Sequence, residues 1–173
     1  MATPGTPSRA ADAAPALHVV LVAPEIPPNT GSIARLCAAT YTRLHLVGPL
    51  GFSLDDRHLK RAGLDYWPHV DLRVYDDWAH FRRQHHGAHC HFLAARAVRP
   101  YIAAPYRPGD HLVFGCETKG LPATLLAAHR DQTFAIPIFS PHVRSLNLSN
   151  AVSIVVYEAL RQMGRVGEGA VER

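Results

Sequence analysis

The sequence predicts one α/β domain with a mostly parallel β-sheet and helices on both faces of that sheet. Apolar runs of strand length alternate along the chain with segments of helical periodicity. Polar segments rich in glycine or proline follow several of the apolar runs. The 173 residues, 47% of them hydrophobic, suffice for one core and are too few for two ordinary domains.

The domain is expected to span residues 16–164, between two tails. Residues 1–15 consist mainly of Ala, Pro, Thr, Gly and Ser and have almost nothing to bury, so a disordered N-terminal tail is predicted. The glycine-rich, polar segment 165–173 predicts a flexible C-terminal tail.

Strands are predicted where short apolar runs lie between turn-forming residues. In chain order, these runs are 17–23, 43–47, 70–75, 91–95, 111–114 and 133–138. Runs that are apolar on both faces are typical of parallel strands covered by helices on each side.

Helices are predicted where apolar residues recur at helical spacing, as Trp78 and Phe81 do. A proline-rich loop is expected over 24–30, and Gly63 ends a short basic helix. The predicted helices are 31–40, 54–63, 78–86, 121–129 and 148–163. The last of these is apolar on nearly every side, which indicates a buried helix.

The net charge of +4 and the pI of about 9.2 permit an anionic partner such as nucleic acid without identifying one. No apolar stretch approaches the length of a membrane span, and the N-terminus lacks the pattern of a secretory signal. Cys37, Cys90 and Cys116 are an odd number and widely spaced, so no disulfide framework is expected. These features predict a cytoplasmic protein without membrane contact.

Twelve histidines raise the question of a metal site, most of all in the segment 85–91. His89 and His91 would lie on one face of a strand and Cys90 on the other. No Cys-x-x-Cys or His-Glu-x-x-His pattern accompanies them. The interpretation is therefore surface or strand-edge histidines, with no bound metal.

Polar residues crowd the junction between the last predicted strand and the last helix: Arg144, Ser145, Asn147, Ser149 and Asn150. A helix cap would need only one of them, so the cluster indicates a site. Two further polar loops, 24–31 and 115–122, also follow predicted strands. Ligands of parallel sheets bind beyond the carboxyl ends of the strands, so the three loops are expected to form one site.

Common nucleotide sites do not fit these loops. Gly115 and Gly120 have the spacing of a phosphate-binding Walker loop, but Leu121 and Pro122 follow where lysine and a hydroxyl residue are needed. A Gly-x-Gly-x-x-Gly motif is also absent. Cys116 has no positioned base that would make it a nucleophile.

Together the loops resemble the three motifs of the SPOUT superfamily of RNA methyltransferases. The matching segments are Asn29-Thr-Gly-Ser-Ile-Ala-Arg35, Phe114-Gly-Cys-Glu-Thr-Lys-Gly-Leu-Pro122, and Ile136-Pro-Ile with Arg144-Ser-Leu-Asn-Leu-Ser-Asn-Ala151. Within the superfamily, the chain is most similar to the bacterial enzymes that 2′-O-methylate the wobble cytidine or uridine of tRNA. The resemblance spans residues 17 to about 164.

The resemblance implies a SPOUT (α/β-knot) fold with a C-terminal deep trefoil knot that holds S-adenosylmethionine. It places donor contacts at Leu93, Gly115, Glu117, Gly120, Ile136, Ser145, Leu146 and Leu148. The glycines are expected to let the backbone approach the ligand closely.

By the same resemblance, Arg35 is the candidate that stabilises the attacking oxygen, with Ser145 and Asn147 orienting ribose or phosphate. Arginine stays protonated, so an electrostatic role is favoured over that of a base. The predicted RNA contacts are Asn29, Arg35, Arg57, Lys60, Arg61 and Lys119. The expected partners are the anticodon loop of tRNA, with leucine isoacceptors favoured, and a second copy packed through the first and last helices. Two alternatives stay open: methylation of another tRNA or rRNA position, and a non-catalytic RNA-binding module.

Overall fold

The computed structural model describes residues 14–55 and 66–167. The strands are β1 (His18–Val22), β2 (Arg43–Val47), β3 (Leu72–Tyr75), β4 (Cys90–Leu93), β5 (Arg99–Pro100), β6 (His111–Phe114) and β7 (Thr133–Ala135). The helices are α1 (Pro27–Thr40), α3 (Trp78–Gln84), α4 (Ala123–Ala128) and α5 (Leu148–Gln162). Short 3-10 helices lie at Trp67–His69, Tyr101–Ala103, Arg130–Gln132 and Arg165–Gly167.

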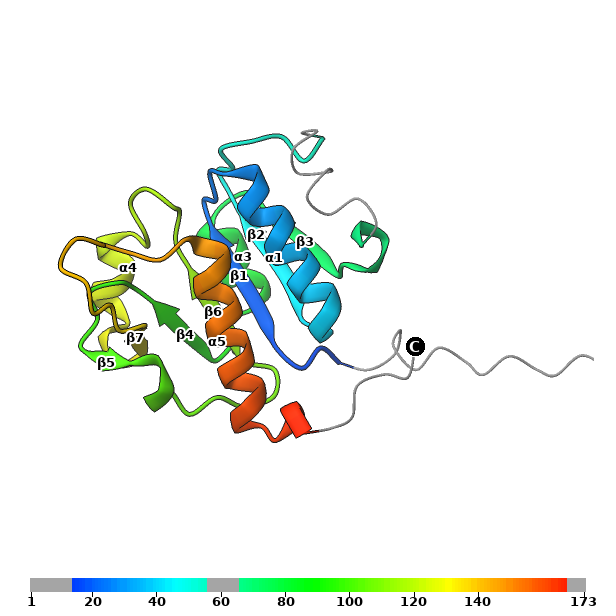
Figure 1. Ribbon diagram of the computed structural model, residues 1–173. Coiled ribbons are helices and arrows are strands. Elements are labelled where there is room, and N and C mark those ends of the chain that lie inside the picture. The colour runs from blue at the N-terminus through cyan, green and yellow to red at the C-terminus, as the bar shows by residue number, and fades with distance from the viewer. Residues whose placement is uncertain (1–13, 56–65, 168–173) are drawn as a thin grey trace, which may run out of the picture.

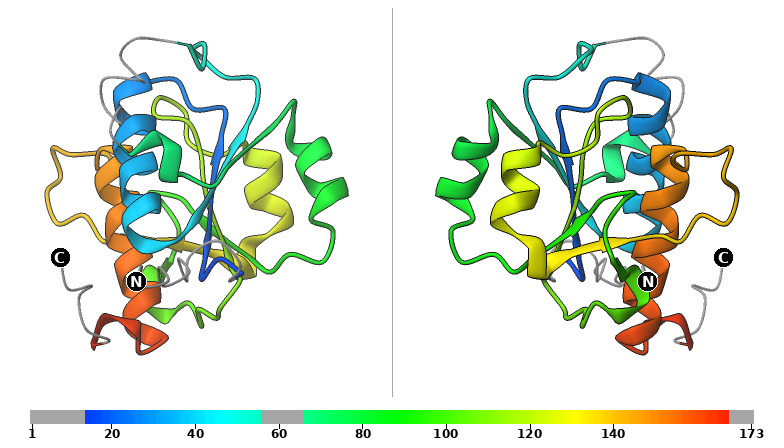
Figure 2. Two further views of the ribbon diagram at one scale, coloured as in Figure 1. Left: turned by 90° about the vertical axis from the view of Figure 1, so that its right-hand side faces the viewer. Right: turned by 90° about the vertical axis from the view of Figure 1, so that its left-hand side faces the viewer.

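The seven described strands form one sheet in the order β3-β2-β1-β6-β4-β7-β5, and every neighbouring pair is parallel. Helices α1 and α5 lie side by side over one face, and α3 and α4 cover the other (Figures 1 and 2). The predicted α/β class with a parallel sheet and helices on both faces is confirmed. The C-terminal trefoil knot stays a prediction.

The core is split by the sheet into two apolar clusters because successive strand residues point to opposite faces. Val19 and Leu21 of β1 pack with residues of α1 and α5, whereas Val20 packs with Phe81 of α3 and Leu121 before α4. Both faces are therefore buried, as the uninterrupted apolar runs predicted.

Helix α1 begins at Pro27 instead of at residue 31, so the predicted boundary with the proline-rich loop is wrong. Proline is well suited to the first helical turn because its missing N–H would have no partner there. The two-residue strand β5 has no apolar run and was not predicted. The basic helix predicted at 54–63 and the tails at 1–15 and 165–173 fall mostly outside the described residues, of which 165–167 form a 3-10 turn.

Parallel topology places the carboxyl ends of the strands at one edge of the sheet, together with the N-termini of the helices that follow them. There α1 begins after β1, and α5 begins after the long loop that follows β7. Among the described residues, no helix combines the length and the apolar character needed to cross a membrane.

Candidate active site

A cleft of about 900 Å³ opens at the carboxyl edge of the sheet. Its walls come from the ends of β4, β6 and β7, from the start of α1 and from the loop before α5. The eight positions predicted to contact the methyl donor all line it: Leu93, Gly115, Glu117, Gly120, Ile136, Ser145, Leu146 and Leu148. The three polar loops therefore meet, as the sequence predicted.

Glu117 ties the loop after β6 to the start of α1. Its carboxylate accepts hydrogen bonds from the backbone N–H groups of Glu25 (2.8 Å) and Ile26 (3.2 Å), and from the Asn29 side chain (3.0 Å). A carboxylate at a helix N-terminus also interacts favourably with the helix dipole. Among the residues that the structure describes, no side chain caps α1, and Glu117 instead fixes the two residues that lead into the helix and the Asn29 side chain.

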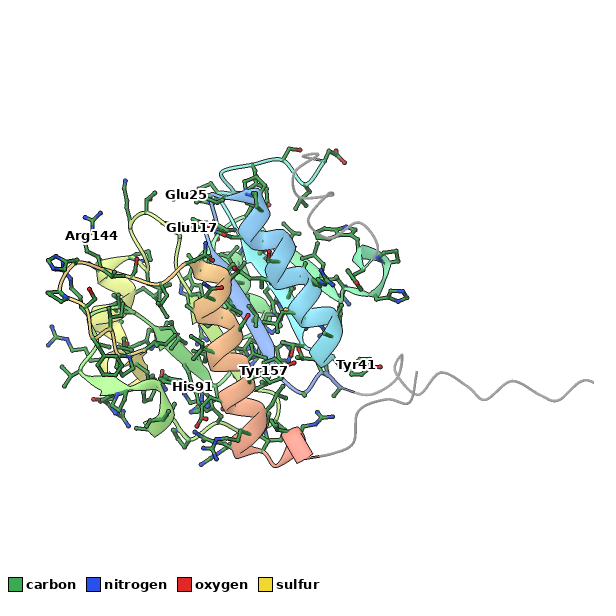
Figure 3. The ribbon with its side chains drawn as sticks, in the orientation of Figure 1. Glu25, Tyr41, His91, Glu117, Arg144 and Tyr157 are labelled. Atoms are coloured by element: carbon green, nitrogen blue, oxygen red, sulfur yellow. The ribbon has the colours of Figure 1, made fainter. Side chains whose placement is uncertain are left out.

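Glu25 makes the opposite contact, from the segment before α1 to the loop after β6, and Asn147 connects this network to α5. Glu25 accepts hydrogen bonds from the backbone N–H and the hydroxyl of Thr118, at 3.2 and 2.7 Å. The Asn147 amide donates to the Asn29 side-chain oxygen at 3.0 Å, while the Asn147 oxygen caps α5 by accepting from Ser149 N–H at 2.9 Å. Figure 3 shows Glu25 and Glu117 close together near the N-termini of α1 and α5. These bonds hold the three loops in one arrangement.

This network gives a structural role to three residues whose predicted ligand contacts stay predictions. Asn29 was predicted to bind RNA, Asn147 to orient the substrate and Glu117 to contact the donor. In the structure, the polar atoms of Asn29 and the Glu117 oxygens are engaged in holding loops together. All three line the cleft, but the described contacts support a positioning role for them.

Gly115 and Gly120 are required for reasons internal to their loop. A Cβ on Gly115 would lie 2.0 Å from the Gly120 carbonyl carbon and 2.1 Å from the Leu121 nitrogen. Gly120 has φ of +71°, which side chains disfavour. The backbone bridge between Cys116 and Gly120 closes this turn. Close approach of two backbone segments is thus one reason for these glycines, and the predicted close approach of a ligand stays a prediction.

Three cations surround the cleft: Arg96, Lys119 and Arg144. All are exposed, and within residues 14–55 and 66–167 none of them forms an ion pair. Arg144 projects from the loop before α5 (Figure 3). Only Lys119 had been assigned a role. The signal for the other two was their place next to a predicted donor contact, three residues after Leu93 and immediately before Ser145.

Arg35 does not line the cleft of its own chain. It is exposed on α1, where its guanidinium donates to the Tyr66 hydroxyl at 3.1 Å and lies 4.5 Å from the centre of the Tyr66 ring. The other predicted RNA contacts, Arg57, Lys60 and Arg61, lie outside the described residues. Ser145 is exposed at the cleft and has no side-chain partner in the described part of the chain, so its hydroxyl is available to a ligand.

The residues of the cleft are suited to binding and aligning a ligand, and less to transferring a proton. Apolar side chains such as Leu93, Ile136 and Leu148 supply a surface for a flat aromatic ring. Backbone groups of the loops can form hydrogen bonds with polar atoms of a ligand. The two clusters of described residues able to hold a metal lie outside this cleft.

Comparison with known proteins agrees with this architecture. Residues 16–157 match the SpoU rRNA Methylase family. The tRNA (cytidine(34)-2'-O)-methyltransferase of Escherichia coli strain K12 is 47% identical over 152 residues, which are 87% of this chain and 96% of that protein.

Solved structures show the same similarity. One concerned with "the 2-OH methylation of C/U34 on tRNA" is 50% identical, covers 86% of this chain and 96% of its own, and superposes with a TM-score of 0.81. An AdoMet-bound rRNA methyltransferase from Sinorhizobium meliloti shares the fold, with a TM-score of 0.75 at 24% identity over 85% of this chain and 56% of its own.

Proposed function

Because the chain belongs to the SpoU methylase family, we propose that it transfers the methyl group of S-adenosylmethionine to the ribose 2′-hydroxyl of the wobble nucleotide, C34 or U34, of tRNA. One observation carries the proposal. All donor positions implied by the sequence motifs converge on one cleft, in a chain that is about half identical to proteins named for this reaction over nearly their whole length.

The cleft fits the donor in size and in surface. Its volume of about 900 Å³ and its apolar wall of Leu93, Ile136 and Leu148 suit an adenosine, while Ser145 and the backbone of the Gly115–Gly120 loop offer polar contacts. When bound, S-adenosylmethionine supplies a methyl group already activated on a sulfonium. The protein therefore has to align the acceptor oxygen, exclude water and manage one proton.

In the reaction, a bond forms between the ribose O2′ and the methyl carbon while the bond from that carbon to sulfur breaks. The hydroxyl proton leaves to solvent or to a neighbouring phosphate. Arg35 cannot accept this proton because its guanidinium stays charged, so its role is to stabilise the negative charge that develops on O2′. Ser145 orients the ribose or its phosphate from the cleft wall.

A homodimer explains how Arg35 reaches a substrate despite lying outside the cleft of its own chain. The outer surface of α1 and α5 exposes apolar side chains, with Tyr41 59%, Ile154 36% and Tyr157 51% exposed (Figure 3). Pairing two copies through this surface would bury those side chains. It would also make each active site from the cleft of one copy and the Arg35 of the other.

The tRNA substrate would bind by its anticodon loop, with Arg96, Lys119 and Arg144 placed to contact phosphates. We assign leucine isoacceptors as the substrates and the cytoplasm as the site of action. Methylation of another tRNA or rRNA position, or RNA binding without catalysis, would be the alternatives.

The test is to map 2′-O-methylation in tRNA and rRNA from cells that lack the protein. The expected result is loss of the methyl group at nucleotide 34 of leucine tRNAs, restored by the wild-type gene and not by one encoding Gly115→Val. Loss at another position would support the first alternative. An unchanged methylation pattern would contradict the enzymatic proposal.

A further inference from the structure

A cluster of histidines lies inside the sheet at the end opposite to the cleft. His18 opens β1, His111 opens β6 and His45 is the third residue of β2. His18 is paired in register with His111, and His45 with Val20, two residues after His18 on the same face of β1. The three side chains are buried, with 9%, 5% and 0% exposure for His18, His111 and His45. They meet although 93 positions separate the first from the last in sequence.

Two of these rings belong to a hydrogen-bonded chain. His18 Nδ1 lies 2.8 Å from His45 Nε2, and His45 Nδ1 lies 2.9 Å from the Tyr75 hydroxyl. The same hydroxyl lies 2.9 Å from Nε2 of His85, which follows α3. All four groups can be neutral in this chain, because each link needs one proton and the groups supply enough of them.

His111 is different because it has no place in this chain. Its ring stacks on that of His18 with centroids 4.0 Å apart, yet neither of its nitrogens has a hydrogen-bond partner within residues 14–55 and 66–167. The Gly109 backbone favours the charged form of His111 slightly but is not in hydrogen-bonding geometry. Leaving a buried polar group unpaired costs about 1–3 kcal/mol, and here two ring nitrogens are unpaired. A bound ligand would remove this cost.

The charge state of the cluster suits a metal ion. Burial lowers the pKa of His18 to about 4, that of His45 to about 2 and that of His111 to about 3. All three rings are thus neutral near pH 7 and carry the lone pair that a metal ligand needs. The nearby Arg43 disfavours an added cation, but it is paired with Asp71 at 2.7 Å, which offsets its charge.

We propose that His18, His45 and His111 bind one Zn²⁺ ion. Their candidate ligand atoms all lie within 4.8 Å of one another. Ligands of a tetrahedral zinc are about 3.4 Å apart, so the His18–His45 contact widens slightly while His111 moves closer. His85 lies beside the cluster, with its ring centroid 5.0 Å from that of His45 and 5.3 Å from that of His111, but its Nε2 is bonded to the Tyr75 hydroxyl, so a water molecule is proposed as the fourth ligand.

The ion would have a structural role. It would join the three adjacent strands β2, β1 and β6, on the face of the sheet that α1 and α5 do not cover. None of the three histidines lines the catalytic cleft, so the zinc takes no part in methyl transfer. A second group, His89, His91 and Asp110, is a weaker candidate because each of its members has a hydrogen-bond partner, at 3.0 and 2.7 Å, whereas His111 has none among the described residues.

The test uses the full chain without an affinity tag, produced in zinc-supplemented medium, because a buried site fills most readily while the chain folds. Metal content is measured by mass spectrometry after dialysis without chelator. The expected result is about one zinc per chain in the wild type and in the control His86→Asn, whose side chain is exposed, and little or no zinc in His111→Asn. A wild type without zinc, or equal zinc in His111→Asn, would overturn the proposal.

If His111→Asn does not fold, X-ray absorption of the zinc-loaded wild type tests the zinc ligands instead. Scattering from at least three imidazole ligands supports the site. Sulfur ligands, or fewer than three imidazoles, would contradict it. In addition, metal removal by unfolding in chelator should lower the thermal stability of the refolded wild type, and zinc should restore it.

Discussion

The two ends of the parallel sheet use polar residues in opposite ways. At the carboxyl end, charged and amide side chains are tied to loop backbones, and three cations face solvent. At the amino end, His18, His45 and His111 are buried and neutral. Among the described residues, His111 has no hydrogen-bond partner. Loops can carry charge because water reaches them, whereas strand residues inside the sheet must satisfy one another or bind an ion. The first end is therefore suited to a changing ligand and the second to a permanent one.

The same difference separates the effects of mutation. At the cleft, the arrangement depends on a few close contacts between loops, so a substitution there should impair ligand binding and leave the fold intact. In the histidine cluster, a substitution acts on the core itself. Cleft variants should therefore change binding or transfer without unfolding the protein, whereas His111→Asn should also lower thermal stability.

The largest effect is expected from Gly115→Val. Its Cβ would meet the backbone of Gly120 and Leu121 at about 2 Å, so the loop has to open and the donor contacts on both sides of it are lost. We expect donor affinity to fall by about 100-fold or more, as for removal of a binding loop worth roughly 3 kcal/mol. Calorimetry in the presence of chelator measures this fall.

The matched control for that variant is Gly87→Val, since a Cβ on Gly87 meets nothing within 4 Å. It should bind the donor normally, and light scattering should show both variants in the oligomeric state of the wild type. Normal donor affinity in Gly115→Val would mean that this loop does not line the donor site.

Arg35→Ala should lose methyl transfer while keeping donor binding, because Arg35 lies outside the cleft. Mixing it with Gly115→Val tests whether Arg35 acts across a dimer. In a mixed dimer, one active site would then carry both defects and the other neither, so random exchange should restore about a quarter of wild-type transfer. Activity that stays at the level of the separate variants would place Arg35 in the site of its own chain.

Glu117→Gln should weaken the tie between the cleft loops without abolishing it. The carboxylate accepts hydrogen bonds from two backbone N–H groups and from Asn29, and the amide can keep only part of them. A loss of about 1–2 kcal/mol, or roughly tenfold in transfer rate, is expected. Asp76→Asn, at a side chain that is 92% exposed, is the control and should change little. Equal rates for both variants would remove Glu117 from the positioning role.

The smallest effect is expected from Lys119→Gln and Arg144→Gln. If each contacts one phosphate, each variant should bind tRNA a few-fold more weakly and reduce the salt dependence of binding by about one charge. Arg83→Gln, on the opposite face of the sheet, should leave both quantities unchanged. An unchanged salt dependence in the two cleft variants would place the RNA elsewhere.

Most of the fold could be predicted because apolar runs mark buried parallel strands directly. The start of α1 could not, since Pro27 reads both as a loop residue and as the first residue of a helix. Strand β5 escaped because two residues carry no periodicity. The motifs predicted residues that line the cleft, but not the contacts that hold those residues in place. The bond from Glu117 to the segment before α1 joins residues 92 positions apart, which no local pattern reveals.

The histidines show the same limit more clearly. His91 was interpreted as a surface or strand-edge residue, but it is buried with only 2% exposure and bonded to Asp110, so that interpretation is wrong for His91, whereas His89 is exposed. His18, His45 and His111 were not predicted to form a site, because no local spacing in the sequence links them. Only the register of β1 with β2 and β6 brings them together. A histidine inside a predicted buried strand is the sequence signal that could have revealed them.

The central claim is that this protein methylates the ribose of the wobble nucleotide, and one measurement tests it most directly. Purified protein is incubated with labelled S-adenosylmethionine and leucine tRNA, either unmodified or carrying a single 2′-deoxyribose at nucleotide 34. If the protein has this activity, we expect one methyl group per unmodified tRNA, mapped to nucleotide 34, and none on the deoxy substrate. Equal methylation of the two tRNAs would contradict it.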